Sequence, residues 1–343
     1  MKVLVTGDKG YIGRILVKHL ISKGYEVVGM DIDYYKGCDL YEDQLPEYKS
    51  IEKDIREVTK EDLEGIDCIH HLAALSNDPL GEKDPGVTME INYEASLKLS
   101  TLAKKAGVMR FVYSSSCSMY GKAGANTVNE ESPLEPLTAY AQSKVKSEAE
   151  ISKLADKMFT PVFLRNSTVY GLSPRLRFDL VVNNLVGSAF TTGKIKIMSD
   201  GTPWRPLIHI EDLAEVFFLV TECEKDVVHN QAFNVGENTE NYQIKDIAEI
   251  VKKVMPECEI TYTYEHGPDT RSYRVNFDKL HTSLKGFKCR KRVEDGVKEL
   301  YAKFKEVGLT YEDFMSYKFT RLKNIRRLME AGKLDKRLHW QVI

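Results

Sequence analysis

The stretch that decides the fold is the first thirteen residues, MKVLVTGDKGYIG, at positions 1–13. An apolar run over 2–6 leads into glycines at positions 7, 10 and 13, and residues 11–23 then repeat apolar side chains at helical spacing as far as Gly24. This order predicts a strand, a glycine-rich turn and a helix. Glycine lets the backbone turn sharply and approach a ligand closely, and the amides of a helix N-terminus suit a pyrophosphate. The GxxGxxG spacing is one residue longer than the common GxGxxG dinucleotide fingerprint, so alone it is a modest signal.

An acidic residue follows where a bound dinucleotide would present its ribose. A second strand is expected at 26–31, ending at Asp31, eighteen residues beyond Gly13. A carboxylate there accepts hydrogen bonds from the ribose hydroxyls and repels a 2′-phosphate, which favours NAD over NADP. Lys9 in the turn weakens this preference, because a cation would tolerate that phosphate. Asp54, in the run KDIRE, could bond the adenine amino group or cap a short helix.

Strands and helices continue to alternate along the N-terminal half. Further strands are expected at 67–73, 111–115 and 161–164, and helices at 92–106 and 140–154. This alternation is typical of a parallel sheet covered on both faces. The predicted fold is therefore α/β, a doubly wound (Rossmann) parallel sheet with a smaller, interleaved C-terminal substrate-binding domain.

The domain boundaries follow from where the alternation loosens. The predicted parts are an NAD-binding Rossmann domain at 1–168 with a returning segment near 206–235, a substrate-binding cap at 169–205 and 236–290, and a helical C-terminal tail at 291–343. The charged run 321–336 in the tail is interpreted either as a solvated helix or as a contact surface.

Composition excludes several function classes. The 343 residues carry a net charge of −2, with 42% hydrophobic and 29% charged residues, so neither nucleic acid nor a membrane surface is an expected partner. No apolar stretch reaches the roughly 18 residues of a membrane span, and the N-terminus does not have the form of a signal peptide. The six cysteines form no CxxC pair, which predicts reduced thiols in a cytoplasmic protein. His70 and His71 would point to opposite faces of a strand, so no metal site is expected.

A candidate chemical centre lies in the run TAYAQSK. Thr138 is the expected N-cap of a helix that carries Tyr140 and Lys144, four residues apart, on one face. An ammonium near a phenol favours the phenolate, so this tyrosine is expected to exchange a proton near neutral pH. The strand FVYSSS ends at Ser116, at the edge where a doubly wound sheet places its ligands, and a serine hydroxyl there would hold a substrate oxygen.

Taken in order, these motifs resemble the extended short-chain dehydrogenases/reductases, specifically the NAD-dependent sugar-nucleotide epimerase/dehydratase branch of UDP-glucose 4-epimerase-like proteins. The matching stretches reach to about residue 280 and are TGDKGYIG, the acidic strand end at Asp31, KDIRE, HLAA at 71–74, INYEAS with Asn92, SSSCSMYG, YAQSK, LRNSTVYG at 164–171 and PLIHIEDLA at 206–214. Several short motifs in the family's order are far more specific than any one of them.

The resemblance implies a role for each matching residue. Tyr140 would be the acid/base, Lys144 would tune it and bind the nicotinamide ribose, and Ser116 would be the catalytic hydroxyl. The implied NAD-binding residues are Gly7, Gly10, Tyr11, Ile12, Gly13, Asp31, Asp54, Ile55, Leu72, Ala73, Ala74, Asn92, Ser114, Tyr140 and Lys144. The implied substrate-binding residues are Asn77, Ser116, Thr168, Arg205 and Arg271, with the two arginines on a diphosphate. The competing interpretations are a turn before Pro79 for Asn77 and surface ion pairs for the arginines.

Two departures from the family pattern bear on the substrate. Members that dehydrate a sugar usually carry Asp-Glu after the strand hydroxyl residue, whereas Cys117 and Ser118 stand here, which disfavours 4,6-dehydration. Thr168 stands where many members have asparagine, and its shorter side chain changes the sugar contact.

The resemblance implies an epimerase that acts on a nucleotide-diphosphate sugar through a transient 4-keto intermediate. Tyr140 would take the hydroxyl proton while hydride passes to NAD, and the hydride would return to the other face. The alternative is a nucleotide-sugar 4-dehydrogenase or 4-ketoreductase, from which the ketosugar leaves. A non-catalytic NAD-binding sensor is disfavoured, because the tyrosine, lysine and serine are all present. The family also implies a homodimer through helices 92–106 and 140–154, although their own sheet could equally cover those faces.

Overall fold

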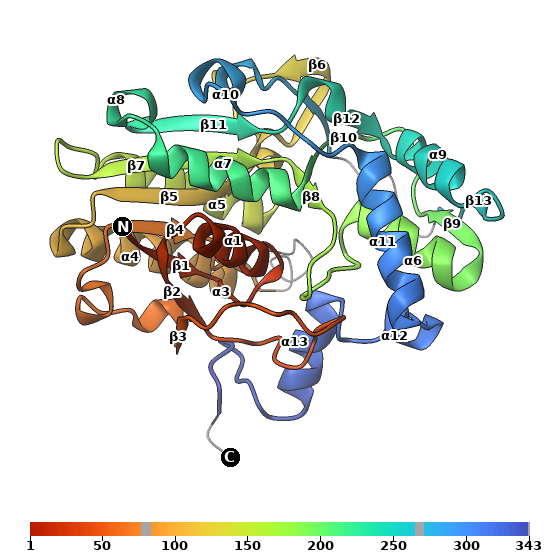
Figure 1. Cartoon of the computed structure of the whole chain (residues 1–343), viewed down its shortest axis with the longest axis horizontal. Helices are drawn as coiled ribbons and strands as arrows, with labels where there is room; N and C mark the ends of the chain where they lie inside the picture. Colours follow the sequence, from red (N-terminus) through yellow and green to blue (C-terminus); the bar gives the residue numbers. More distant parts are fainter. Residues whose placement is uncertain (77–83, 265–270, 342–343) are drawn as a thin grey trace.

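The computed structural model describes residues 1–76, 84–264 and 271–341, and its largest element is a sheet of seven strands (Figure 1). The strands are, in order across the sheet, β11 (Gln231–Val235), β7 (Thr160–Asn166), β5 (Arg110–Ser116), β4 (Cys68–His71), β1 (Lys2–Thr6), β2 (Glu26–Asp31) and β3 (Lys49–Glu52). All neighbouring pairs are parallel. The chain winds outward from β1 in both directions, which confirms the predicted doubly wound class.

Helices cover both faces of this sheet. On one face α1 (Tyr11–Ser22) and α7 (Ile210–Glu222) pack side by side, and on the other lie α3 (Pro85–Met89), α4 (Ala95–Ala106) and α5 (Ala139–Ser152) (Figure 1). Strand side chains alternate between two cores: Val3 and Val5 join the core under α1 and α7, whereas Leu4 joins the core under α4. Both faces of β1 are therefore apolar, as expected for a buried parallel strand.

A smaller region stands beside the carboxyl edge of the main sheet (Figure 1). Its strands pair as β12–β10–β8, β13–β9 and β14–β6. Their bounds are β6 (Lys122–Val128), β8 (Thr168–Tyr170), β9 (Lys194–Ile197), β10 (Trp204–His209), β12 (Asn241–Gln243), β13 (Glu259–Tyr262) and β14 (Ser272–Val275). Between β10 and β12 the chain returns to the main sheet as α7 and β11. The predicted interleaving is thus present, and the division into domains at the stated residues stays a prediction.

The remaining helices are α6 (Val181–Thr192), α8 (Lys225–Val228), α9 (Ile244–Val254), α10 (Asp278–Ser283), α11 (Val293–Val307), α12 (Tyr311–Met315) and α13 (Arg321–Glu330). Short turns complete the described elements: η1 (Ile55–Glu57), η2 (Glu61–Leu63), η4 (Cys117–Tyr120), η5 (Asn238–Glu240), and a wider π turn, η3 (Glu90–Glu94). The helix predicted at 92–106 begins earlier, since α3 continues through η3 into α4. Its start is fixed by Pro85 in the first turn and by Asp84, whose side chain accepts a hydrogen bond from the Val87 amide at 3.1 Å.

The C-terminal tail folds back onto the end of β2. Ile325 and Leu328 of α13 are buried in the same core as Leu4. The Asn324 amide donates to the Tyr34 carbonyl at 2.7 Å, and beyond the helix the Trp340 indole donates to the Ile32 carbonyl at 3.0 Å. The interpretation of 321–336 as a merely solvated helix is therefore wrong: one face makes a contact surface, and that surface meets the chain's own N-terminal half.

Candidate active site

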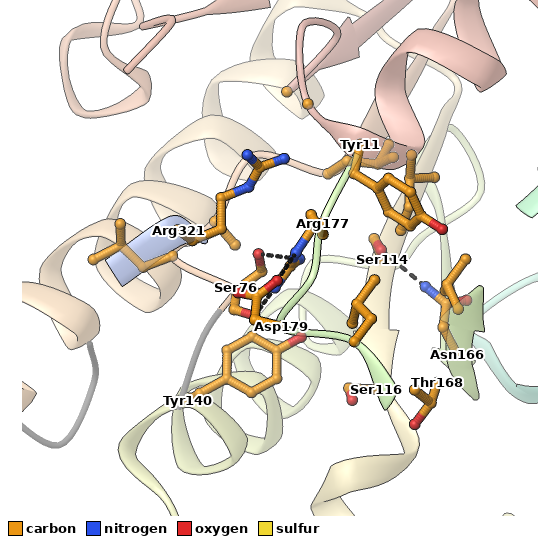
Figure 2. Close-up of a pocket in the computed structure, with 18 of the residues that line it drawn as sticks. Tyr11, Ser76, Ser114, Ser116, Tyr140, Asn166, Thr168, Arg177, Asp179 and Arg321 are labelled. Atoms are coloured by element: carbon orange, nitrogen blue, oxygen red, sulfur yellow. Dashed lines mark hydrogen bonds and ion pairs between the residues drawn. The ribbon is translucent and has the colours of Figure 1, made fainter. Parts of the chain in front are cut away.

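A cavity of about 960 Å³ opens where the carboxyl ends of the central strands meet the smaller region (Figure 2). The predicted site residues that line it are Gly7, Gly10, Tyr11, Ile12, Gly13, Asp31, Asp54, Ile55, Leu72, Ala73, Ala74, Ser114, Ser116, Tyr140, Lys144, Thr168, Arg205 and Arg271. Of the two others, Asn77 lies outside the described residues, and Asn92 lies behind the cavity wall. The structure therefore brings the predicted cofactor, catalytic and substrate residues to one site, at the sheet edge where ligands of this fold class bind.

The glycine turn is shaped for close approach. Gly7 has φ +76°, and a Cβ on it would stand 2.9 Å from the backbone nitrogen of Ala73. A Cβ on Gly13 would stand 2.0 Å from the Gly7 carbonyl oxygen. Gly10 is the N-cap of α1 and supplies no side chain to bond the first amides of the helix. Those amides and the helix dipole favour an anion, so the turn fits the pyrophosphate of NAD.

Asp31 ends β2 at the rim of the cavity. Its carboxylate accepts hydrogen bonds from the backbone nitrogens of Lys9, at 3.2 Å, and Asp33, at 2.7 Å. Burial, together with the nearby Asp8 carboxylate, raises the pKa of Asp31 to about 6, so it is largely ionised at neutral pH. The Lys9 ammonium lies 3.5 Å from Asp33 and 3.6 Å from Glu52. This excess of carboxylates opposes a 2′-phosphate and fits the free ribose hydroxyls of NAD.

Asp54 borders the cavity with its carboxylate already engaged. It accepts a hydrogen bond from the backbone nitrogen of Arg56 at 2.8 Å, which caps η1, and it forms an ion pair with the Arg56 guanidinium at 2.5 Å. The structure thus supports the helix-cap interpretation. A bond from Asp54 to adenine stays a prediction.

Asn92 is buried beside the cavity and holds a neighbouring loop. Its side chain is 1% exposed. Its Oδ1 accepts a hydrogen bond from the Leu75 backbone nitrogen at 2.8 Å, and its Nδ2 donates to the Leu75 carbonyl at 3.1 Å. From the π turn η3, Asn92 thus fixes the loop after β4, and Leu75 and Ser76 of that loop line the cavity. A contact from Asn92 to the cofactor stays a prediction.

Tyr140 and Lys144 lie on the first turns of α5, as predicted. The Thr138 hydroxyl caps this helix by accepting a backbone hydrogen bond at 3.2 Å. Lys144 Nζ donates to the Ser114 carbonyl at 2.6 Å and lies 4.6 Å from the ring centre of Tyr113 and 5.7 Å from that of Tyr140. The Tyr140 hydroxyl is directed into the cavity (Figure 2).

The Lys144 ammonium is held in a poorly solvated position. The residue is 3% exposed, and this burial lowers its pKa to about 7, although the Glu148 carboxylate acts in the opposite direction. An ammonium near a phenol favours the phenolate, and Lys144 Nζ lies 5.7 Å from the ring centre of Tyr140. Proton exchange between Tyr140 and a substrate hydroxyl stays a prediction.

Hydroxyl groups at the ends of β5 and β7 line another side of the cavity (Figure 2). The Ser116 hydroxyl caps η4 by accepting a backbone hydrogen bond at 3.2 Å. The Ser114 hydroxyl accepts a hydrogen bond from Asn166 Nδ2 at 2.9 Å. Thr168 begins β8 in the same wall. These groups can bind sugar oxygens, and the specific roles of Ser116 and Thr168 stay predictions.

Arg205 and Arg271 lie together on the side of the smaller region. Arg205 Nη1 donates to the Arg271 carbonyl at 2.5 Å, and its guanidinium carbon lies 5.9 Å from the Tyr273 ring centre. Arg205 is 6% exposed, which does not fit a surface ion pair. Both arginines line the cavity, so a diphosphate contact stays open to them.

A polar cluster inside the cavity was not apparent from the sequence motifs. Arg177 pairs with Asp179 at 2.9 Å and donates to the hydroxyl of Ser76 at 2.9 Å, which links the loop after β4 to the start of the smaller region (Figure 2). Asn166 Oδ1 is buried and bonds no other described residue. The run PRLRFD, with two arginines between apolar residues, was the available signal for this cluster. Nothing local distinguishes Arg321, which reaches the same cavity from α13.

The two histidines of β4 point to opposite faces, as predicted. His71 bonds the hydroxyls of Thr6, at 2.6 Å, and Ser96, at 2.7 Å, while His70 bonds that of Thr221 at 2.7 Å. Across 1–76, 84–264 and 271–341, no three His, Cys, Asp or Glu side chains are grouped to hold a metal ion. Over the same ranges no helix has the length and apolar character to cross a membrane. All six cysteines are free thiols.

Comparison with known proteins identifies the family of this chain. The model of the NAD dependent epimerase/dehydratase family matches residues 3–236. UDP-glucose 4-epimerase of Lactobacillus helveticus is 28% identical over 338 residues, which cover 91% of this chain and 100% of that protein. dTDP-D-glucose 4,6-dehydratase of Mus musculus is 26% identical over 316 residues, or 87% of each chain.

Solved structures with a similar fold also include enzymes that act on nucleotide sugars. UDP-glucuronic acid 4-epimerase from Bacillus cereus, in complex with UDP-glucuronic acid and NAD, superposes with a TM-score of 0.77 at 25% identity, covering 90% of this chain and 100% of that chain. The NAD-dependent NDP-hexosamine 5,6-dehydratase TunA shares the fold, with a TM-score of 0.79 at 23% identity over 89% of this chain and 98% of that chain. Together with the glycine turn, Asp31 and the Tyr140–Lys144 pair, these matches show that the chain belongs to the NAD-dependent epimerase/dehydratase family and is an NAD-dependent enzyme of the extended short-chain dehydrogenase/reductase type.

Proposed function

We propose that the enzyme is a nucleotide-sugar epimerase that works through a transient 4-keto intermediate. The observation that carries this proposal is the pairing of Tyr140 with the buried Lys144 in a cavity that also holds the glycine turn and the serines of β5. The proteins that are similar in sequence and those that are similar in fold both include 4-epimerases of UDP sugars. A nucleotide-diphosphate sugar is accordingly the proposed substrate.

In the proposed reaction Tyr140 takes the proton from the sugar 4-hydroxyl, and the Lys144 ammonium stabilises the phenolate that favours this transfer. Bound NAD supplies the hydride acceptor and donor. Ser116 and Thr168 hold sugar oxygens, and Arg205 and Arg271 bind the diphosphate, so that the sugar can turn while its anchor stays in place. Tyr140 then returns the proton to the oxygen on the reduced carbon, and the substrate differs from the product only in configuration.

Dehydration is a poorer fit, although several relatives are dehydratases. Water elimination needs a further acid and base beside the sugar. Cys117 stands at one of the two positions, is 1% exposed and donates its thiol to the Arg165 carbonyl at 3.0 Å. Burial raises the pKa of that thiol, so it does not supply a proton donor or acceptor to the cavity.

Incubation of the pure protein with a panel of nucleotide sugars, without added oxidant, separates the proposal from a 4-dehydrogenase or 4-ketoreductase. We expect an epimer to form with no net change at 340 nm, the absorbance of NADH. Accumulation of NADH, or a requirement for an added keto acceptor, would instead identify an oxidoreductase that releases its ketosugar.

We also propose a homodimer, on the family resemblance alone. The outward residues Gln142 and Lys146 of α5 are exposed and polar, so a partner helix would meet a polar surface there. Light scattering at micromolar concentration is expected to give twice the chain mass of 39.1 kDa. A measured mass equal to that of a single chain would exclude the homodimer and would not affect the proposed reaction.

A further inference from the structure

Arg321, the first residue of α13, is a buried cation that forms no ion pair with a carboxylate in residues 1–76, 84–264 and 271–341. It is 4% exposed. Its Nη2 donates to the Arg175 carbonyl at 3.1 Å, and its guanidinium carbon lies 4.1 Å above the centre of the Tyr35 ring. Its Nη1 is buried and bonds nothing in the described parts of the chain. A buried charged donor with no acceptor is costly, which indicates that a ligand supplies the acceptor.

The two neighbouring arginines, unlike Arg321, each form an ion pair with a carboxylate. Arg175 forms ion pairs with Asp33 at 3.1 Å and Asp39 at 2.9 Å, and Arg177 pairs with Asp179. Burial and the charges of these two arginines lower the pKa of Arg321 to about 10, against the opposing effect of Tyr35 and Asp179. Both of these arginines thus have carboxylate partners, whereas Arg321 forms no ion pair within the described residues.

The position of Arg321 indicates which part of a bound ligand it would contact. Arg321 lies over the segment that follows β2, and it lines the same cavity as the glycine turn. Its charge also reaches the phenol of Tyr11, the first residue of α1, where it opposes the rise in pKa caused by burial. Figure 2 shows its guanidinium turned toward the end of the cavity where Tyr11 lies. A dinucleotide held by a glycine turn places its pyrophosphate at the start of α1 and its adenosine ribose at the end of β2. A cation that lies over the segment after β2 and faces Tyr11 is therefore directed at the pyrophosphate.

The tail holds Arg321 firmly in this position. About one turn further along the helix, the Asn324 amide donates to the Tyr34 carbonyl at 2.7 Å, and the Tyr34 hydroxyl donates to the Leu338 carbonyl at 2.5 Å. Ile325 and Leu328 anchor the same helix in the core. The guanidinium is thus preorganised, which reduces the entropy lost when it binds a phosphate.

We propose that α13 completes the cofactor site, with Arg321 Nη1 donating a hydrogen bond to the pyrophosphate of NAD from the side opposite the glycine-turn amides. The C-terminal tail then acts as a strap that retains the cofactor between turnovers. The proposal rests on NAD as the cofactor and not on the reaction or on the sugar, and a binding measurement tests it without substrate turnover.

The test compares ligands that share the adenosine or the diphosphate. Calorimetric titration uses the full chain, freed of copurified nucleotide, with ADP-ribose, adenosine, UDP and dTDP. Arg321→Gln is expected to weaken ADP-ribose by about tenfold or more, since a hydrogen bond between charged groups is lost. Adenosine, UDP and dTDP are expected to change by less than about twofold, because none of them reaches the NAD pyrophosphate position with a phosphate. Arg321→Lys, which keeps the charge but not the fork of donors, is expected to lose less.

The matched control is Arg326→Gln, an exposed arginine on the opposite side of the same helix, which is expected to bind all four ligands like the parent protein. Equal weakening of adenosine and ADP-ribose by Arg321→Gln would assign the residue a structural role and overturn the proposal. Weakening confined to UDP or dTDP would assign it to the substrate diphosphate, and unchanged binding of ADP-ribose would remove it from the site. Either result overturns the proposal as well.

Discussion

Tyr140 is the residue on which the proposed chemistry depends most. Tyr140→Phe removes the proton acceptor while leaving the ring on α5, so kcat is expected to fall by about 10²–10⁴-fold. Bound NAD should stay at the parent level, because Lys144 keeps its hydrogen bond to the Ser114 carbonyl. Turnover of the sugar found in the panel, with NAD content from absorbance, measures both. Tyr311→Phe, at an exposed tyrosine of α12, is the control, and undiminished turnover by Tyr140→Phe would exclude the assigned proton transfer.

Substitutions at Gly7 and Gly24 distinguish the effect of a steric clash from the effect of a positive φ angle. Gly7 and Gly24 both have positive φ, +76° and +85°, but only at Gly7 would an added Cβ meet another atom, the Ala73 nitrogen at 2.9 Å. Gly24→Ala is expected to lower the free energy of unfolding by about 1 kcal/mol from conformational strain. Gly7→Ala should cost more and should also lose bound NAD. Chemical denaturation and NAD content check this prediction, and equal behaviour of the two variants would mean that the turn does not need its close contact with the backbone after β4.

At the level of elements, β4 carries two histidines that make stability depend on pH. Burial lowers the pKa of His70 and of His71 from 6.5 to about 3. Between these values the unfolded chain binds more protons than the folded chain, so the free energy of unfolding falls as the pH drops below 6.5. At pH 5 each histidine is expected to lower it by about 2 kcal/mol.

Urea unfolding at pH 7 and pH 5 measures this effect. His70→Gln combined with His71→Gln is expected to flatten the pH dependence, whatever it does to stability at pH 7, while His339→Gln at a half-exposed position of the tail should leave it steep. An unchanged slope in the double variant would show that other groups cause the acid sensitivity.

The local sequence pattern predicted the boundaries of those strands and helices whose ends are set by neighbouring residues. β1 and β2 have the predicted bounds, because an apolar run ends at a glycine turn in one case and at Asp31 in the other. α5 begins where Thr138 caps it. The start of α3 was missed, since Asp84 and Pro85 mark a helix that the apolar spacing of 92–106 does not show. The spacing had no means of revealing the π turn that places Asn92 behind the cavity wall.

In the whole molecule, the parts of the site that arise from one motif were predictable and those assembled from distant segments were not. Tyr140 and Lys144 are four residues apart, so helical geometry brings them together. Arg321 meets Tyr35 across 286 positions of sequence, through the docking of the tail on the main sheet. The bond from Arg177 to Ser76 likewise joins segments whose contact depends on the packing of the smaller region.

The central claim is that the enzyme inverts a sugar carbon by removing and returning the same hydride, with Tyr140 moving only the hydroxyl proton. The most direct measurement is the NMR spectrum of the product formed from a nucleotide sugar in D₂O without added oxidant. The account predicts a 4-epimer that carries ordinary hydrogen on carbon 4. Solvent deuterium on the inverted carbon would contradict it, because that carbon would then have lost its hydrogen as a proton.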